Sequence, residues 1–252
     1  MRQALLRLAQ LVPARARPWL ARRRSLGRLV TRALGGQGLQ IVTLHGGALD
    51  GITLELDPSH EKAFWSGTHE PAIQRLLSSE VTAEMVCWDV GAHIGFFSLL
   101  LARRARLVVA LEAHPVNAAR LRRNVELNDL PVHVVEAAVW REAGTVSLRV
   151  APMSGMHAVV DSADDGTVTV AAITLDQLLA DYPPPDLVKI DVEGAEVAVL
   201  EGATTALQHT SFVLCETHGR DARSGAYARL LELGFSVSEA GDDYLVARRV
   251  AS

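Results

Sequence analysis

One acidic residue and two glycines meet in a short stretch of this sequence, VCWDVGAHIGFFS, residues 86–98. Asp89, Gly91 and Gly95 lie between an apolar run typical of a buried strand and another typical of a helix. The next apolar run ends in Glu112, twenty-one residues after Gly91. A glycine turn lets a ligand approach the backbone, and a carboxylate at the end of the following strand can accept hydrogen bonds from both ribose hydroxyls. The spacing therefore predicts a nucleoside-binding site.

Asp89 restricts the kind of nucleoside that suits this turn. The dinucleotide fingerprint GxGxxG begins with a glycine, whereas this chain has Asp89 there and lacks a glycine-rich cradle for a pyrophosphate. An acidic residue at that point favours a ligand with positive charge. S-adenosylmethionine combines a cationic ammonium and sulfonium with a ribose, so we expect this cofactor. An NAD-dependent oxidoreductase is the less favoured alternative.

A second group of polar residues follows two later apolar runs. Asp191 and Glu193 come directly after LVKI, and Glu216 and His218 end the stretch FVLCETH. Carboxylates and an imidazole at strand ends suit proton transfer to or from a substrate. Asp191, Glu216 and His218 are also ligand types for Mg²⁺ or Mn²⁺, but no spacing confirms a site and we expect no metal. The alternative is that Asp191 and Glu193 cap a helix whose dipole they and Glu196 favour, and that His218 lies in a surface loop.

Strand-like and helix-like stretches alternate from residue 85 onward. This alternation predicts right-handed βαβ units, a mostly parallel α/β sheet, and helices on both faces. Ligands bind such a sheet at the carboxyl ends of its strands, where both polar groups are expected. Residues 145–150 and 168–175 favour two further strands, and residues 234–249 an antiparallel terminal hairpin. The remaining expected elements are strands 85–90, 106–112, 132–136, 186–191 and 211–217 and helices 93–104, 115–128, 174–181 and 194–207.

Six segments together resemble the FkbM-type family of S-adenosylmethionine-dependent methyltransferases. They are WDVGAHIGFFS, LEAHPVNAARLRRNVELN, AAVWREAGTVSL, ITLDQLL, LVKIDVEGAEVAVLEGA and LCETH. The resemblance runs from about Gly51 to Val246, and it implies a seven-stranded Rossmann-like sheet of order 3-2-1-4-5-7-6. The chain has His93 and His114 where such proteins often have Asn and Pro. Neither difference removes a carboxylate.

The resemblance also implies which parts of the cofactor each position contacts. Asp89, Gly91 and His93 would surround its methionyl part, and Glu112 would bind its ribose. Residues 136–139 would line the adenine. Glu70 matches a family position before the core and is expected near the methionine end, or alternatively serves as a charge at a helix N-terminus. The expected cofactor-binding residues are thus Glu70, Asp89, Gly91, His93, Gly95, Glu112, Glu136 and Ala138.

The same resemblance implies O-methylation of a hydroxyl on a sugar, a glycolipid or a natural product. An aliphatic hydroxyl is a weak nucleophile, so a base near the acceptor would help. Asp191 is the first candidate for a catalytic or substrate-orienting carboxylate, and Glu216 or His218 for the proton acceptor. The alternative is a non-catalytic cofactor-binding or membrane-associated scaffold, which would tolerate loss of Asp191 and Glu216.

Charge is unevenly distributed along the chain. Residues 1–49 hold nine arginines and no acidic residue, within an overall net charge of −4. We expect a basic amphipathic helical extension over residues 1–36, a β-hairpin and helix cap over 37–80, and the cofactor-binding methyltransferase domain over 81–252. Arginines and Pro13 interrupt the apolar runs of the extension before a signal peptide or membrane span can form.

The partners follow from these features. The basic extension is expected to pack on its own acidic domain, with contact to an anionic membrane as the alternative. Nucleic acid is not expected, because YPPPD precedes the fourth strand of the sheet and its prolines cannot hold a base at the active site. Two cysteines without paired spacing fit a reducing cytoplasm. The residues leave the oligomeric state open.

Overall fold

The computed structural model describes residues 38–58, 60–150, 158–160, 166–241 and 243–249. The chain divides into two compact units, one built from residues 81–122 and 131 onward and the other from residues up to 80 with 123–130. The basic extension predicted for residues 1–36 lies outside the described residues. Across the described ranges, no helix is long and apolar enough to cross a membrane.

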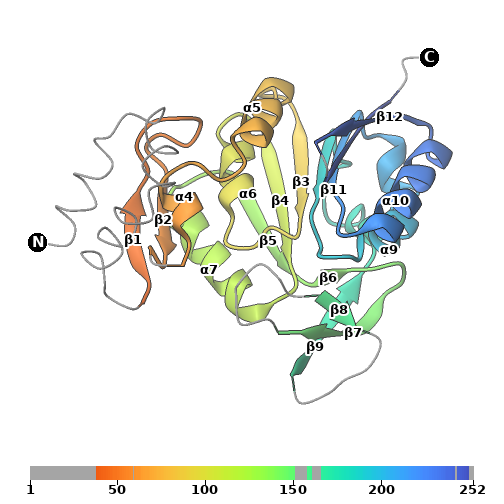
Figure 1. Ribbon diagram of the computed structural model, residues 1–252, viewed down its shortest axis with the longest axis horizontal. Coiled ribbons are helices and arrows are strands. Elements are labelled where there is room, and N and C mark those ends of the chain that lie inside the picture. Colours follow the sequence, from red (N-terminus) through yellow and green to blue (C-terminus); the bar gives the residue numbers. More distant parts are fainter. Residues whose placement is uncertain (1–37, 59, 151–157, 161–165, 242, 250–252) are drawn as a thin grey trace, which may run out of the picture. The chain divides into compact units, whose positions relative to one another are not determined.

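A seven-stranded sheet forms the centre of the larger unit (Figure 1). Its hydrogen-bonded order is β12-β13-β11-β10-β3-β4-β5, which becomes 3-2-1-4-5-7-6 when the strands are numbered along the chain and read from β5. This confirms the predicted order. β13 runs antiparallel to both neighbours, and the other pairs are parallel. The strands are β3 (Val86–Val90), β4 (Leu107–Glu112), β5 (Val132–Glu136), β10 (Leu187–Ile190), β11 (Phe212–Glu216), β12 (Phe235–Ala240) and β13 (Tyr244–Arg249).

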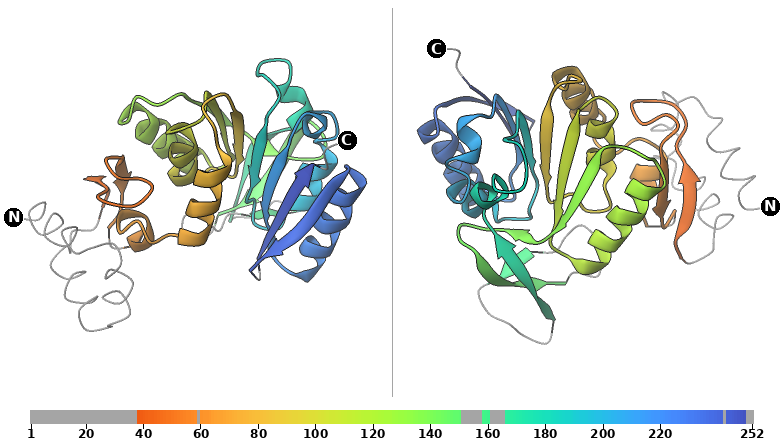
Figure 2. Two further views of the ribbon diagram at one scale, coloured as in Figure 1. Left: turned by 90° about the horizontal axis from the view of Figure 1, so that it is seen from above. Right: turned by 180° about the vertical axis from the view of Figure 1, so that it is seen from behind.

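Helices cover both faces of this sheet, as predicted. Trp88 of β3 belongs to an apolar core with Val199 of α9 and Leu230 of α10. Because side chains alternate along a strand, Asp89 points to the opposite face, where Ser98 of α6 donates a hydrogen bond to it. In Figure 2, α10 lies beside the β12–β13 hairpin. The helices are α6 (Phe96–Ala102), α7 (Pro115–Glu126), α8 (Leu175–Leu178), α9 (Glu196–Glu201), the 3-10 helix η1 (Ala206–Gln208) and α10 (Arg220–Glu232).

The helix predicted over residues 194–207 is shorter in the structure. It is α9, which ends at Glu201 and is followed by Gly202 as its C-cap, and η1 comes next as a separate turn. A Cβ at Gly202 would overlap the backbone carbonyl oxygen of Trp140. The glycine therefore permits a close approach between segments far apart in sequence, and helix propensity alone does not reveal such a contact.

A second, four-stranded sheet occupies the chain between β5 and β10. Its order is β6-β9-β7-β8. Residues 145–150 and 168–175 form strands as predicted, but β7 and β9 pair antiparallel with each other and not with the central sheet. A small buried apolar cluster in this sheet consists of Ala138, Leu148 and Val170. The strands are β6 (Ala138–Val139), β7 (Gly144–Arg149), β8 (Ala158–Val160) and β9 (Thr167–Ile173).

The smaller unit contains the predicted hairpin and helix. The antiparallel strands are β1 (Gln40–Thr43) and β2 (Thr53–Leu56), followed by α4 (Lys62–Trp65) and α5 (Pro71–Glu80). The side-chain oxygens of Asn124 and Asn128 accept hydrogen bonds from the backbone of β2, at 2.6 and 2.8 Å. These bonds satisfy strand N–H groups that would otherwise face solvent.

Gly91 is the point where the ends of β3 and β10 approach each other. Its φ is +81°, in the left-handed region, and a Cβ there would overlap the backbone carbonyl of Asp191. Asp191 in turn donates its N–H to the carbonyl of Val90 at 2.9 Å. The glycine thus brings Asp191 against the turn that carries Asp89, a reason for Gly91 beyond the expected approach of a ligand.

We expect Gly91→Ala to lower the free energy of unfolding by about 3 kcal/mol, the sum of left-handed strain and overpacking. Gly194→Ala is the matched control, because Gly194 also has a positive φ but has open space where the Cβ would stand. It should cost only about 1 kcal/mol. Urea denaturation of both variants measures the difference. Equal losses would contradict the close approach at Gly91.

Candidate active site

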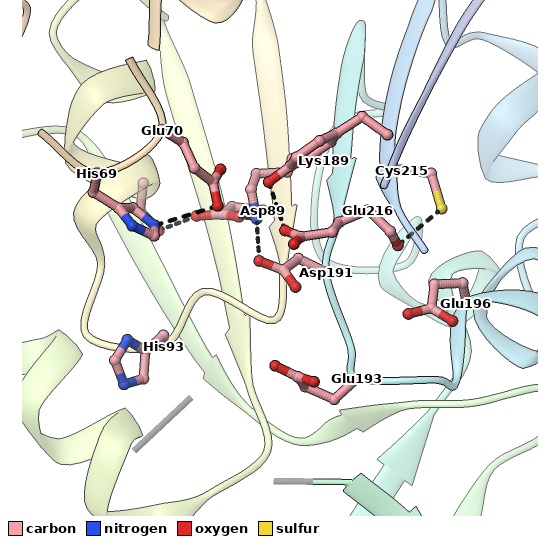
Figure 3. Close-up of polar contacts among 12 residues, drawn as sticks. His69, Glu70, Asp89, His93, Lys189, Asp191, Glu193, Glu196, Cys215 and Glu216 are labelled. Carbon is pink, nitrogen blue, oxygen red and sulfur yellow. Dashed lines mark hydrogen bonds and ion pairs between the residues drawn. The ribbon is translucent and has the colours of Figure 1, made fainter. Parts of the chain in front are cut away.

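Asp89 is completely buried at the carboxyl end of β3, among the residues shown in Figure 3. The Ser98 hydroxyl donates to its Oδ2 at 2.5 Å, and its Oδ1 lies 3.9 Å from the ammonium of Lys189. Burial raises the pKa of Asp89 above its ordinary value, while Lys189 and Ser98 act in the opposite direction. The carboxylate is therefore held by one cation and one hydroxyl.

Lys189 connects Asp89 to the second group of polar residues. Its buried ammonium donates to Oδ2 of Asp191 at 3.0 Å and lies 4.9 Å from the centre of the Phe97 ring. Burial would lower the pKa of Lys189, but Asp191 and Asp89 outweigh it and raise the pKa. Burial would likewise raise the pKa of Asp191, but Lys189 holds it below its ordinary value. Both groups are therefore charged at neutral pH.

Glu112 ends β4 and closes the glycine turn. Its two oxygens accept the backbone N–H groups of His93 and His114, each at 2.8 Å. Burial raises the pKa of Glu112 to about 7, although these bonds and Asn117 oppose the shift. A carboxylate has about four lone-pair positions, so further donors can still bind. His93 has a positive φ of 52°, which turns its N–H toward Glu112.

His218 stands among four carboxylates. Its Nδ1 lies 2.7 Å from Oε1 of Glu196, and its Nε2 lies 3.5 Å from Glu193, 3.9 Å from Glu216 and 4.0 Å from Asp191. The hydrogen bond with Glu196 is the largest cause that raises the pKa of His218 to about 9, with burial opposing it. The imidazole is therefore protonated at neutral pH, and in that state it cannot accept a proton.

Asp191, Glu193 and His218 offer ligand atoms within 4.8 Å of one another. In the described part of the chain this trio has the composition of a metal site, with Glu193 in the place that the sequence suggested for Glu216. A cation there would have to displace the proton of His218, so its binding would compete with protonation. We assign no metal to this group.

The remaining predicted residues lie in different surroundings. Glu216 accepts a hydrogen bond from the Tyr244 hydroxyl at 2.5 Å. Glu136 is the register partner of Glu112 and forms an ion pair with Arg122 at 2.7 Å. Ala138 is buried in β6, where it pairs with β9, and Gly95 precedes α6 with a φ of +92°.

Glu70 belongs to the smaller unit. It precedes α5, has a positive φ of 42°, and lies 3.8 Å from Nε2 of His69. Its backbone carbonyl accepts the N–H of Gln74, which begins the hydrogen bonding of α5. Its role toward a cofactor stays a prediction.

Sequence reasoning missed three polar contacts of the site. Ser98 is the one polar residue in the run FFSLLLA, and a lone hydroxyl in a buried apolar helix signals a buried partner. Tyr244 reaches Glu216 through the antiparallel pairing of β13 with β11, which no local pattern reveals. Glu196 begins α9, as the helix-dipole alternative expects, and it also bonds His218.

Comparison with known proteins agrees with this architecture. The sequence matches the Methyltransferase FkbM domain over residues 89–242. Hexuronic acid methyltransferase AglP of Haloferax volcanii is 30% identical over 188 residues, which cover 71% of this chain and 77% of that protein.

Two solved structures share the fold at 16% identity and a TM-score of 0.50. Precorrin-6y C5,15-methyltransferase from Geobacter metallireducens is matched over 72% of this chain and 89% of its own. The tRNA (uracil-54, C5)-methyltransferase of Pyrococcus abyssi, in complex with S-adenosyl-L-homocysteine, is matched over 85% and 45%. By the domain match and the identity to a hexuronic acid methyltransferase, this chain is a methyltransferase and belongs to the FkbM family.

Proposed function

We propose that this methyltransferase transfers the methyl group of S-adenosylmethionine to a hydroxyl oxygen of a sugar or a sugar-containing acceptor. The observation that carries the proposal is the buried contact of Lys189 with both Asp89 and Asp191. It links an acid at the glycine turn, suited to a cationic cofactor, to an acid suited to the acceptor. The sugar class is supported by the hexuronic acid methyltransferase related to this chain.

The residues of the turn fit the proposed cofactor. Oδ1 of Asp89 is buried and, among the described residues, makes no hydrogen bond. Such an atom favours a bound donor or cation. Glu112 retains lone pairs that could accept hydrogen bonds from ribose hydroxyls. It lies beside a turn whose residues Gly91, His93 and Gly95 have positive φ. Asp89 and Glu112 would then hold the two ends of the cofactor, and a pyrophosphate would be repelled, which disfavours NAD.

An acceptor hydroxyl fits the charges better than an acceptor carboxylate. Asp191, Glu193 and Glu216 all lie within 4.0 Å of Nε2 of His218, so the site is rich in negative charge. A carboxylate that served as the methyl acceptor would be repelled there, whereas a neutral hydroxyl would not. The ion-paired Asp191 also favours an enzyme over a non-catalytic scaffold, because perturbed carboxylates gather at sites of chemistry.

We assign to Asp191 the role of accepting the proton of the acceptor hydroxyl. When bound, S-adenosylmethionine supplies a methyl group whose bond to a positively charged sulfur breaks as the bond to the acceptor oxygen forms. The acceptor hydroxyl then loses its proton, and Asp191 takes it. The pKa of His218, about 9, leaves that imidazole protonated and unable to do so at neutral pH. A carboxylate of low pKa suffices because an oxygen that gains a methyl group becomes strongly acidic.

Labelled methyl transfer tests the proposed function directly. The full chain is incubated with methyl-labelled S-adenosylmethionine and either neutral sugars or uronic acids, and the product is treated with mild alkali. We expect label on a hydroxyl oxygen, as an ether that alkali leaves intact. Label released as methanol would indicate a methyl ester and contradict the hydroxyl assignment. Binding without any transfer would favour the scaffold.

Glu112→Ala should weaken binding of S-adenosylhomocysteine by about 1 to 3 kcal/mol, because hydrogen bonds to a charged acceptor are lost. In the unmodified protein, affinity should rise as pH increases through about 7, since ribose donors favour the ionised carboxylate and the pKa of Glu112 is about 7. Titration calorimetry measures both effects. Glu142→Ala, at an exposed glutamate, is the control. An affinity independent of pH and of Glu112 would remove this residue from the ribose.

Asp191→Asn should lower kcat by about 10² or more, because the amide keeps the size of the side chain but cannot accept the proton. The affinity for S-adenosylhomocysteine should change little. Asp181→Asn, at an exposed position after α8, serves as the control. Steady-state kinetics and calorimetry on folded protein separate the two quantities. An unchanged kcat would leave Asp191 as a structural partner of Lys189.

A further inference from the structure

Glu196 is completely buried, whereas Asp191, Glu193 and Glu216 are partly exposed. It is the first residue of α9, where an acidic side chain favours the helix dipole. That interaction contributes about 0.3 to 1 kcal/mol. Removing a carboxylate from water costs several kcal/mol. The dipole therefore does not account for the burial, and a specific partner must.

That partner is His218. Oε1 of Glu196 lies 2.7 Å from Nδ1 of His218 and also accepts the N–H of Gly194 at 2.9 Å. The imidazole is thus bonded on its Nδ1 side by a buried acceptor, itself held by the backbone. The carboxylate and the ring come from different segments, since His218 follows β11 and Glu196 begins α9.

Close packing of two helices fixes this arrangement. A Cβ at Gly225 of α10 would lie 2.8 Å from Cγ2 of Val197, the residue after Glu196. The glycine lets α10 approach the first turn of α9. Because His218 lies just before α10, the same packing sets the distance between His218 and Glu196.

We propose that Glu196 is a positioning residue for methyl transfer, which holds the His218 ring so that its Nε2–H faces the carboxylates of Asp191, Glu193 and Glu216. This inference rests on the proposed function, because those carboxylates border the acceptor. Glu196 acts through His218 and does not itself touch the acceptor. The three Nε2 to carboxylate distances of 3.5 to 4.0 Å define the orientation.

The protonated and oriented His218 ring reduces the repulsion among the carboxylates around it. Three carboxylates that share one small site repel each other, and like charges disfavour the ionised form of a proton acceptor. A positive Nε2–H among them offsets that repulsion. Lys189 of β10 balances Asp191 from the other side, at 3.0 Å. Loss of the Glu196 contact would free the ring to turn and would leave these carboxylates without the neighbouring cation.

Three variants test the role of Glu196. Glu196→Ala removes the acceptor, Glu196→Gln keeps an oxygen of similar reach, and Glu201→Gln changes an exposed glutamate at the other end of α9. We expect kcat to fall by about 10²-fold in Glu196→Ala, the loss typical of a group misplaced by about 1 Å. Glu196→Gln should recover much of it. Glu201→Gln should match the parent, and the affinity for S-adenosylhomocysteine should stay unchanged throughout.

Nitrogen-15 NMR of the imidazoles gives a readout independent of turnover. In the cofactor-free full chain, His218 should show a downfield Nδ1–H proton that disappears in Glu196→Ala and persists in Glu201→Gln. Absence of that signal in the parent would overturn the inference and leave the proposed function standing. Loss of the signal with kcat unchanged in folded Glu196→Ala would also overturn it. Absence of methyl transfer by the parent would instead contradict the proposed function.

Discussion

The buried ammonium of Lys189 is the constraint on which the site depends. A lysine with a side chain 2% exposed is stable only when carboxylates compensate its charge. Asp89 does so from the neighbouring strand β3, and Asp191 from the end of β10, the strand that carries Lys189. The parallel pairing of β3 with β10 and the absence of a side chain at Gly91 bring the two acids to this one cation. Removal of Lys189 would leave two poorly solvated carboxylates facing each other. The glycine turn that carries Asp89 and the polar group around Asp191 are therefore parts of a single electrostatic unit.

Neighbouring charges also explain why Asp191 and His218 have different protonation states in the site. Lys189 keeps Asp191 ionised, and Glu196 keeps His218 protonated. The Asp191 carboxylate is thus available to accept a proton at neutral pH, as its ordinary pKa already suggests, whereas the His218 imidazole is held protonated although its ordinary pKa would leave it mostly neutral. The excess of acidic groups favours a cationic cofactor and a neutral acceptor. These preferences come from the surroundings of the side chains and not from their identities alone.

Much of the fold was readable from the sequence because its strands are buried on both faces. Continuous apolar runs such as VVAL in β4 predict such strands, and the family resemblance supplied their order. The placement of Asp89, Gly91 and Glu112 on one turn followed from the same runs. Local patterns did not reveal that β7 and β9 form a separate sheet. The end of α9 before Gly202 was equally hidden, and so was the close approach of the Trp140 backbone to that glycine, because the two residues are far apart in sequence.

The sequence predicted which residues form the candidate site better than it predicted the contacts between them. Asp191, Glu216 and His218 were identified by their positions at strand ends. The structure brings both carboxylates within 4.0 Å of Nε2 of His218. Their protonation states depend on Lys189, which lies two residues before Asp191, and on Glu196, whose partner His218 becomes apparent only when separate βα segments pack together. Titration calorimetry of the full chain with S-adenosylmethionine and, separately, NAD⁺ decides whether the acidic glycine turn binds a cationic cofactor. We expect one saturable site for S-adenosylmethionine and no heat of binding for NAD⁺. Saturable binding of NAD⁺ without any response to S-adenosylmethionine would show that the turn is a dinucleotide site instead.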